Sequence, residues 1–140
     1  MANPVHRVML FVYQREAPER LRYLIVRPAP RQENFWQPVH VPIEPGETVA
    51  AAALRRLGSG LHLPDPDEVV DIHHFERFHL GDFDCVDWTF ACGFRKCVER
   101  LDLPADLQDY QWVPIDWAFQ LIDEDASRRA VMKLHLALAG

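Results

Sequence analysis

Two carboxylates and two arginines lie close together in the chain and are its clearest candidates for chemistry. Glu44 and Glu47 precede a predicted helix, and Arg55 and Arg56 lie near the end of that helix. We expect Arg55 to form an ion pair with Glu44 or Glu47. A carboxylate beside a helix N-terminus is also stabilised by the helix dipole, so Glu47 has a structural interpretation beside any role in a reaction.

A second set of polar residues lies farther along the chain, where His73, His74 and His79 accompany Glu76 and Asp82. Imidazole and carboxylate groups are ligands of transition metals. Successive residues of a strand point to opposite faces, so of the adjacent histidines only His74 shares a face with Glu76. The pattern favours a polar strand face over a metal site.

Two tryptophans, Trp36 and Trp88, have side chains that can stack on a nucleobase. The default expectation for both is packing in the hydrophobic core.

Local signals predict strands, a helix, more strands and further helices, an order typical of a mixed α/β or α+β sandwich. Thr48 is the predicted N-cap of the first helix, and Gly58 and Gly60 are expected to end it. Asp116 is the expected cap of the second helix.

The predicted helices are Val49–Leu57, Trp117–Leu121 and Glu124–Leu138. The predicted strands are His6–Tyr13, Leu21–Val26, Trp36–Val39, Glu68–Phe78, Val86–Phe94 and Tyr110–Val113. The predicted loops are Gln14–Glu19, Pro28–Asn34, Pro42–Gly46 and Pro104–Gln111.

The stretch from Trp36 to Leu63 resembles the box of the Nudix hydrolase family. Gly46-Glu47-Thr48 matches the family's Gly-Glu-Thr turn, Arg55 falls on the motif arginine, and Leu57 and Leu63 fall on its apolar positions. Phe35-Trp36-Gln37 and Tyr110-Gln111-Trp112-Val113, followed by Asp116, resemble the flanks of bacterial dATP and dihydroneopterin triphosphate pyrophosphohydrolases. The resemblance implies a Nudix-fold α/β/α sandwich with a mixed central sheet, formed by residues 1–140 as a single domain.

The chain departs from the family pattern where the metal ligands are expected. Arg56, Ser59 and Gly60 stand at positions of the family's glutamates, and Val41 and His62 stand at positions of its glycines. In the family these glutamates bind Mg²⁺, which neutralises the diphosphate and activates water. A guanidinium group repels a divalent cation. The sequence therefore predicts a degenerate box that has lost the standard activity.

The resemblance also assigns candidate site residues. Glu47, Arg55 and Asp106 are the vestigial catalytic residues, and Glu47 is the remaining candidate metal ligand. Asp106 lies six residues before Trp112, where related proteins often carry a glutamate that acts near the metal. Arg56 is a candidate to replace the metal and bind a phosphate directly, although the default expectation is a solvated arginine on the helix face. Glu44 and Trp36 complete the ligand-binding candidates.

Three functions remain open. The favoured one is a protein that binds a nucleotide-like small molecule or a protein partner without hydrolysing it. The second is an active hydrolase of a nucleoside diphosphate linked to another moiety, with Mg²⁺ held by non-standard ligands drawn from Glu44, Glu47, Asp106 and Asp109. The third is a pure assembly module that uses the fold as a platform.

The composition limits the partners. The chain has 140 residues, of which 49% are hydrophobic, and a formal net charge of −6. An acidic surface argues against nucleic acid as a partner, and the apolar runs are too short for a membrane span. Cys85, Cys92 and Cys97 lack the spacing of a metal site and, with no signal peptide evident, favour a reduced cytoplasmic location. A homodimer is compatible with this kind of fold.

Overall fold

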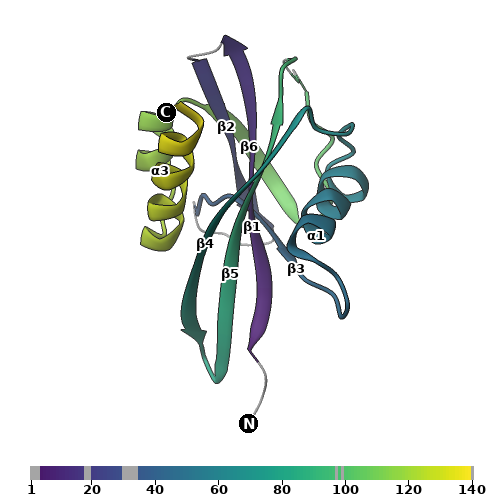
Figure 1. Ribbon diagram of the computed structural model, residues 1–140, viewed down its shortest axis with the longest axis vertical. Coiled ribbons are helices and arrows are strands. Elements are labelled where there is room, and N and C mark those ends of the chain that lie inside the picture. The colour runs from purple at the N-terminus through teal and green to yellow at the C-terminus, as the bar shows by residue number, and fades with distance from the viewer. Residues whose placement is uncertain (1–3, 18–19, 30–34, 97, 99, 140) are drawn as a thin grey trace.

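The computed structural model describes residues 4–17, 20–29, 35–96, 98 and 100–139, and within them a central mixed sheet carries helices on both faces. In Figure 1, α1 lies on one side of the sheet and α3 on the other. This confirms the predicted α/β/α sandwich. The strands are β1 (Val5–Ala17), β2 (Arg20–Pro28), β3 (Val39–Pro42), β4 (Glu68–Leu80), β5 (Phe83–Phe94) and β6 (Leu107–Val113); the helices are α1 (Val49–Arg55), α2 (Ile115–Leu121) and α3 (Asp125–Ala139), with a π-helical turn at Arg56–Gly60.

The strand order is β4-β5-β1-β2-β6, and β3 pairs with the first half of β1. β1 and β5 run parallel, whereas the other pairs are antiparallel. β1 and β2 form the predicted hairpin, with Tyr13 opposite Tyr23. β1 is therefore the strand to which β2, β3 and β5 all attach.

The central strand β1 is buried on both faces, which explains its continuous apolar sequence. Val8, Leu10 and Val12 point into the core beneath α1. Met9, Phe11 and Tyr13 point into the second core, which α2 and α3 cover. The alternation of strand side chains thus serves two cores at once.

Local signals place the start of α1 as predicted. The Thr48 hydroxyl oxygen accepts a hydrogen bond from the Ala51 amide at 3.0 Å and so caps the helix. Gly46 precedes it with a φ of +80°, a conformation that glycine adopts without strain. Ala52 and Ala53 are buried against the sheet, so the alanine run supplies both helix propensity and close packing.

The predicted end of this helix is only partly correct. The α-helix stops at Arg55, and Arg56–Gly60 continues as a π-helical turn, so Gly58 does not end the helical segment whereas Gly60 is its last residue. The Leu61 amide donates to the Arg56 carbonyl at 2.9 Å, five residues back. The Ser59 hydroxyl donates to the Arg55 carbonyl at 2.7 Å, a side-chain bond of the kind that bends helices.

Two predictions around β1 are corrected by strand pairing. Gln14 was expected in a turn, but β1 continues to Ala17 because Gln14 pairs with Arg22 of β2. Residues 18 and 19 of that predicted turn lie outside the described residues. Of the strand predicted at Trp36–Val39, Gln37 forms an isolated bridge with Val26 and Val39 begins β3. β3 runs on to Pro42, which pairs with Arg7, so Pro42 belongs to the strand and not to the predicted loop.

Three further boundaries shift. Pro28 ends β2 instead of beginning a loop, and residues 30–34 of that predicted loop lie outside the described residues. Pairing with β2 extends β6 back to Leu107, inside the predicted loop Pro104–Gln111. Asp116 lies in the first turn of α2, whose N-cap is Pro114, so it does not cap the helix.

Cys85 and Cys92 are buried free thiols, and burial raises the pKa of the Cys92 thiol to about 12. Cys97 lies outside the described residues. None of the described helices is long and apolar enough to cross a membrane.

Candidate functional site

The turn before α1 is fixed by an ion pair between Glu47 and Arg55. The Arg55 guanidinium donates to both Glu47 oxygens, at 2.8 and 3.0 Å, and to the Pro42 carbonyl at 2.8 Å. Glu47 also accepts a bond from the Glu44 amide at 3.0 Å. The hydrogen bonds from Arg55 and, to a smaller extent, the bond from the Glu44 amide hold the pKa of Glu47 below its usual range. The structure shows the predicted Arg55 ion pair, and both oxygens of Glu47 are engaged in it.

Arg56, the residue after Arg55, pairs with Asp106 from the loop before β6. Its Nη2 lies 2.7 Å from Oδ2 of Asp106, and its Nη1 lies 3.4 Å from Oδ1. The Arg56 side chain is 14% exposed, whereas that of Asp106 is 59% exposed. The Nε of Arg56 is buried and has no hydrogen-bond partner. The sequence singled out both residues, and the structure brings them together.

Gly60 leaves room for the Arg56 side chain. A Cβ atom at position 60 would lie 2.9 Å from Cδ and 3.2 Å from Nη1 of Arg56, closer than ordinary van der Waals contact. A Cβ atom at Gly58 would meet nothing within 4 Å. Sequence reasoning missed this dependence, although a glycine four residues after a long side chain on a helical turn is a signal for it.

Each carboxylate considered as a Mg²⁺ ligand lies near an arginine. Glu44 is largely exposed, with an oxygen 3.8 Å from Arg55, and Asp109 lies 3.7 Å from Arg27. Within the described parts of the chain, no three His, Cys, Asp or Glu side chains lie together as a potential metal site. Glu47 and Asp106 each face a different arginine, so the two do not form a shared carboxylate site.

Trp36 is buried in the core between the sheet and α2 and α3, with 6% of its surface exposed. Its backbone amide donates to the Asp123 carboxylate at 2.7 Å, and the Arg27 guanidinium lies 5.7 Å from its ring centroid. The structure thus places this ligand-binding candidate within the packed interior.

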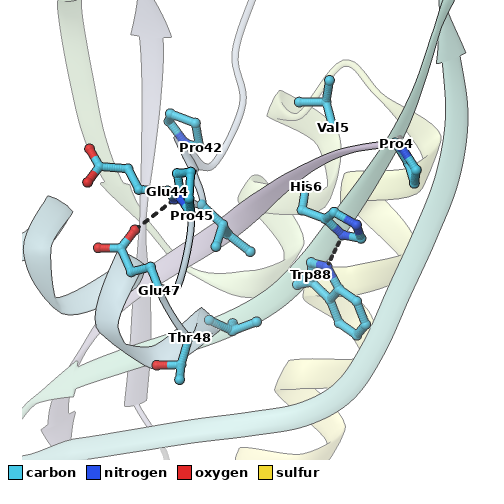
Figure 2. A pocket seen from close by; sticks show the side chains of 11 residues that line it. Pro4, Val5, His6, Pro42, Glu44, Pro45, Glu47, Thr48 and Trp88 are labelled. Carbon is cyan, nitrogen blue, oxygen red and sulfur yellow. Dashed lines mark hydrogen bonds between the residues drawn. The ribbon is translucent and has the colours of Figure 1, made fainter. Parts of the chain in front are cut away.

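A groove of about 690 Å³ borders the turn before α1. Figure 2 shows Pro42, Glu44, Pro45 and Glu47 on one side of it and His6 and Trp88 on the other. The Trp88 indole N–H donates to the His6 Nδ1 at 3.0 Å. The Trp88 ring is also 5.1 Å from that of Phe75. Of the two tryptophans considered for base stacking, only Trp88 lines this groove.

The polar face of β4 carries compensating charges. His74 lies 3.5 Å from Glu76, as the shared strand face predicted, and Lys133 of α3 approaches its other ring nitrogen at 3.1 Å. Arg129 binds Glu76 at 2.7 Å. Two cations thus face the pair, and this arrangement ties β4 to α3.

Comparison with solved structures establishes the fold. The chain superposes on a Nudix hydrolase from Listeria monocytogenes with a TM-score of 0.79 and 16% identity, covering 95% of this chain and 93% of that one. It superposes on the dihydroneopterin triphosphate pyrophosphohydrolase of E. coli with a TM-score of 0.77 and 17% identity, covering 94% and 95%. The Nudix domain of Shewanella oneidensis NrtR, solved with ADP-ribose, gives 0.77 at 12% identity, covering 99% and 90%. The chain therefore has the Nudix fold.

Comparison with protein sequences adds a relative of a different name. Known family profiles give no match. An octanoyltransferase from Myxococcus xanthus is 29% identical over 135 residues, which cover 93% of this chain and 36% of that protein. The chain thus spans about a third of the length of the relative that it matches.

Proposed function

We propose that this Nudix-fold chain binds a phosphorylated, nucleotide-like ligand through Arg56 and lacks the standard Mg²⁺-dependent pyrophosphohydrolase activity. The observation that carries the proposal is the placement of Arg56. Its side chain is largely buried, it already holds one carboxylate in a two-point contact, and its buried Nε is left without a partner. A planar guanidinium matches the oxygens of phosphate as well as those of a carboxylate.

The residues of this region do not fit a magnesium ion. Mg²⁺ requires oxygen ligands in near-octahedral geometry. Arg56 offers only N–H donors, Gly60 offers no side chain, and the Ser59 hydroxyl is bonded to the Arg55 carbonyl. Glu47 and Asp106 are each neutralised by an arginine. These contacts support a degenerate box in which the positive charge comes from the protein itself.

The experiment is a binding and turnover assay on one panel of nucleoside triphosphates, ADP-ribose, NAD and diadenosine polyphosphates. We expect calorimetric binding in the presence of EDTA, its loss in Arg56→Gln, and no loss in Arg20→Gln, a matched change at an exposed arginine. With Mg²⁺ or Mn²⁺ we expect negligible turnover. Metal-dependent release of phosphate or pyrophosphate, lowered by Glu47→Gln, would overturn the proposal in favour of an active hydrolase.

A second candidate function is that of a partner in octanoyl transfer. The supporting observation is the 29% identity to a segment that makes up 36% of the Myxococcus xanthus octanoyltransferase. On this proposal the chain binds the octanoyltransferase of its own source organism, and calorimetry with the two purified proteins is expected to give one-to-one binding. The proposal would be rejected if no heat of binding is detected with the two proteins at concentrations up to about 100 μM, which would reveal even a weak interaction.

A further inference from the structure

We infer that Asp106 is an internal competitor of the ligand: it pairs with Arg56 when the site is free, and a terminal phosphate group displaces it. The inference rests on the proposed function and specifies how that same site is regulated. It assigns Asp106 a role opposite to that of a residue which helps to bind the ligand.

Arg56 is the fixed member of the pair. Its side chain is mostly buried and passes so close to Gly60 that even a Cβ atom there would meet it at 2.9 Å. It leaves a helical turn that is bonded to α1 through Ser59 and closed by the bond from the Leu61 amide to the Arg56 carbonyl. The guanidinium therefore stays in place when its carboxylate partner leaves.

Asp106 is the movable member of the pair. More than half of its side chain is exposed, so its carboxylate can be hydrated as soon as it leaves Arg56. Its backbone is held independently, because its carbonyl accepts a bond from the Ala29 amide at 2.8 Å and Leu107 begins β6 directly after it. Displacement then needs only rotation of the side chain between staggered rotamers, without movement of the loop.

A phosphate group is the ligand chemistry suited to this exchange. It offers the same two-oxygen face as the Asp106 carboxylate, but it carries up to two negative charges and a further acceptor oxygen. The departing carboxylate is exposed, and exposed ion pairs contribute little stability, so its loss costs little. A ligand with a single carboxylate has no such advantage over Asp106, and the site accordingly selects phosphate over carboxylate.

The test compares Asp106→Asn with the wild type, using inorganic phosphate, pyrophosphate and ATP in EDTA as probes. Removing a competitor worth about the energy of an exposed ion pair should tighten binding by up to about five-fold. Asp106→Ala is expected to act in the same direction. Asp102→Asn, a carboxylate removed from an exposed position four residues earlier, should leave the affinity unchanged.

The outcomes separate this inference from the proposed function. If the wild type binds the probes through Arg56 but Asp106→Asn binds equally or more weakly, Asp106 is a positioning residue and the inference is overturned while the proposed function stands. If neither the wild type nor Asp106→Asn binds any probe, the proposed function itself fails. Acetate should displace phosphate only when it is present in large excess. Displacement at equal concentrations would contradict the selectivity for phosphate.

Discussion

A side chain at position 60 would collide with Arg56, since its Cβ atom would lie 2.9 Å from the Arg56 Cδ. The two residues are four positions apart on the π-helical turn. The burial of the guanidinium beside Asp106 therefore depends on the absence of a side chain at Gly60. A substitution at position 60 is therefore also expected to move the Arg56 side chain.

This relationship gives a matched pair of substitutions. Gly58→Ala adds a methyl group where nothing lies within 4 Å, and replacing a helical glycine with alanine should raise the free energy of unfolding by up to about 1 kcal/mol. Gly60→Ala should gain less, because the methyl group displaces Arg56. We expect Gly60→Ala alone to weaken phosphate binding in EDTA. Equal binding by both variants, measured by calorimetry, would show that Arg56 does not need this space.

The Glu47–Arg55 pair is expected to act on stability and not on ligand binding. Glu47→Gln removes a carboxylate that receives two bonds from Arg55 and one from the Glu44 amide, so the melting temperature should fall. Glu44→Gln is the control. Glu44 is exposed, and its carboxylate contacts Arg55 only at the long distance of 3.8 Å, so this change should lower the melting temperature less. Because the pKa of Glu47 is lowered in the folded state, its contribution is present above its unfolded pKa and is lost on further acidification.

That expectation is contradicted if Glu47→Gln leaves the melting temperature unchanged but abolishes binding of the nucleotide panel. Such a result would make Glu47 part of the ligand site.

The features predicted correctly from the sequence are those set by neighbouring residues. The start of α1 follows from Gly46, Thr48 and the alanine run, all within a few positions of one another. The burial of Arg56 was missed because its ion-pair partner, Asp106, lies fifty residues away. The burial of Trp36 agrees with the default expectation from the sequence, whereas its contact with the distant Asp123 was not predicted. Local patterns contain no record of such contacts.

The strand boundaries failed for a related reason. The polarity of Gln14 predicts a turn, yet its side chain is 4% exposed and accepts a hydrogen bond from the Val98 amide at 2.9 Å. The pairing of Arg22 with Gln14 extends β1 beyond its apolar run. A polar residue is stable inside a strand when a distant segment satisfies it, and the single sequence does not reveal that segment.

Gly93→Ala should destabilise the fold strongly. Tyr13 of β1 lies opposite Gly93 of β5, and a Cβ atom at Gly93 would fall 2.2 Å from the Tyr13 ring carbon Cζ. The ring is fixed by a hydrogen bond from its hydroxyl to Glu68 at 2.8 Å. Overpacking of this kind costs about 1–3 kcal/mol, measured by denaturant unfolding.

A double-mutant cycle isolates the contact. In a Tyr13→Leu background the ring is gone, so adding Gly93→Ala should cost clearly less than it does in the wild type. Equal costs in the two backgrounds would place the penalty in the β5 backbone and not in the Tyr13 ring.

His40 should make the protein less stable in mild acid. It lies on β3 with both ring nitrogens buried and without hydrogen-bond partners. Burial, with a smaller effect of the nearby Arg7 charge, lowers the pKa of His40 from 6.5 to about 3. Asp87 is 3.7 Å away, but Arg7 already binds both of its oxygens, at 2.9 and 3.0 Å, so it does not keep His40 protonated.

The sign follows from proton binding. Below pH 6.5 the unfolded chain protonates His40 and the folded chain does not, so stability falls as the pH decreases towards 3. At about 1.36 kcal/mol per pH unit, the loss should reach about 2 kcal/mol at pH 5. Urea unfolding of His40→Gln between pH 7 and pH 5 should show a flatter dependence on pH than the wild type. His79→Gln, at a histidine side chain that is 82% exposed, should retain the wild-type slope. An unchanged slope in His40→Gln would mean that the buried imidazole is protonated in the folded state, with Asp87 shared between it and Arg7.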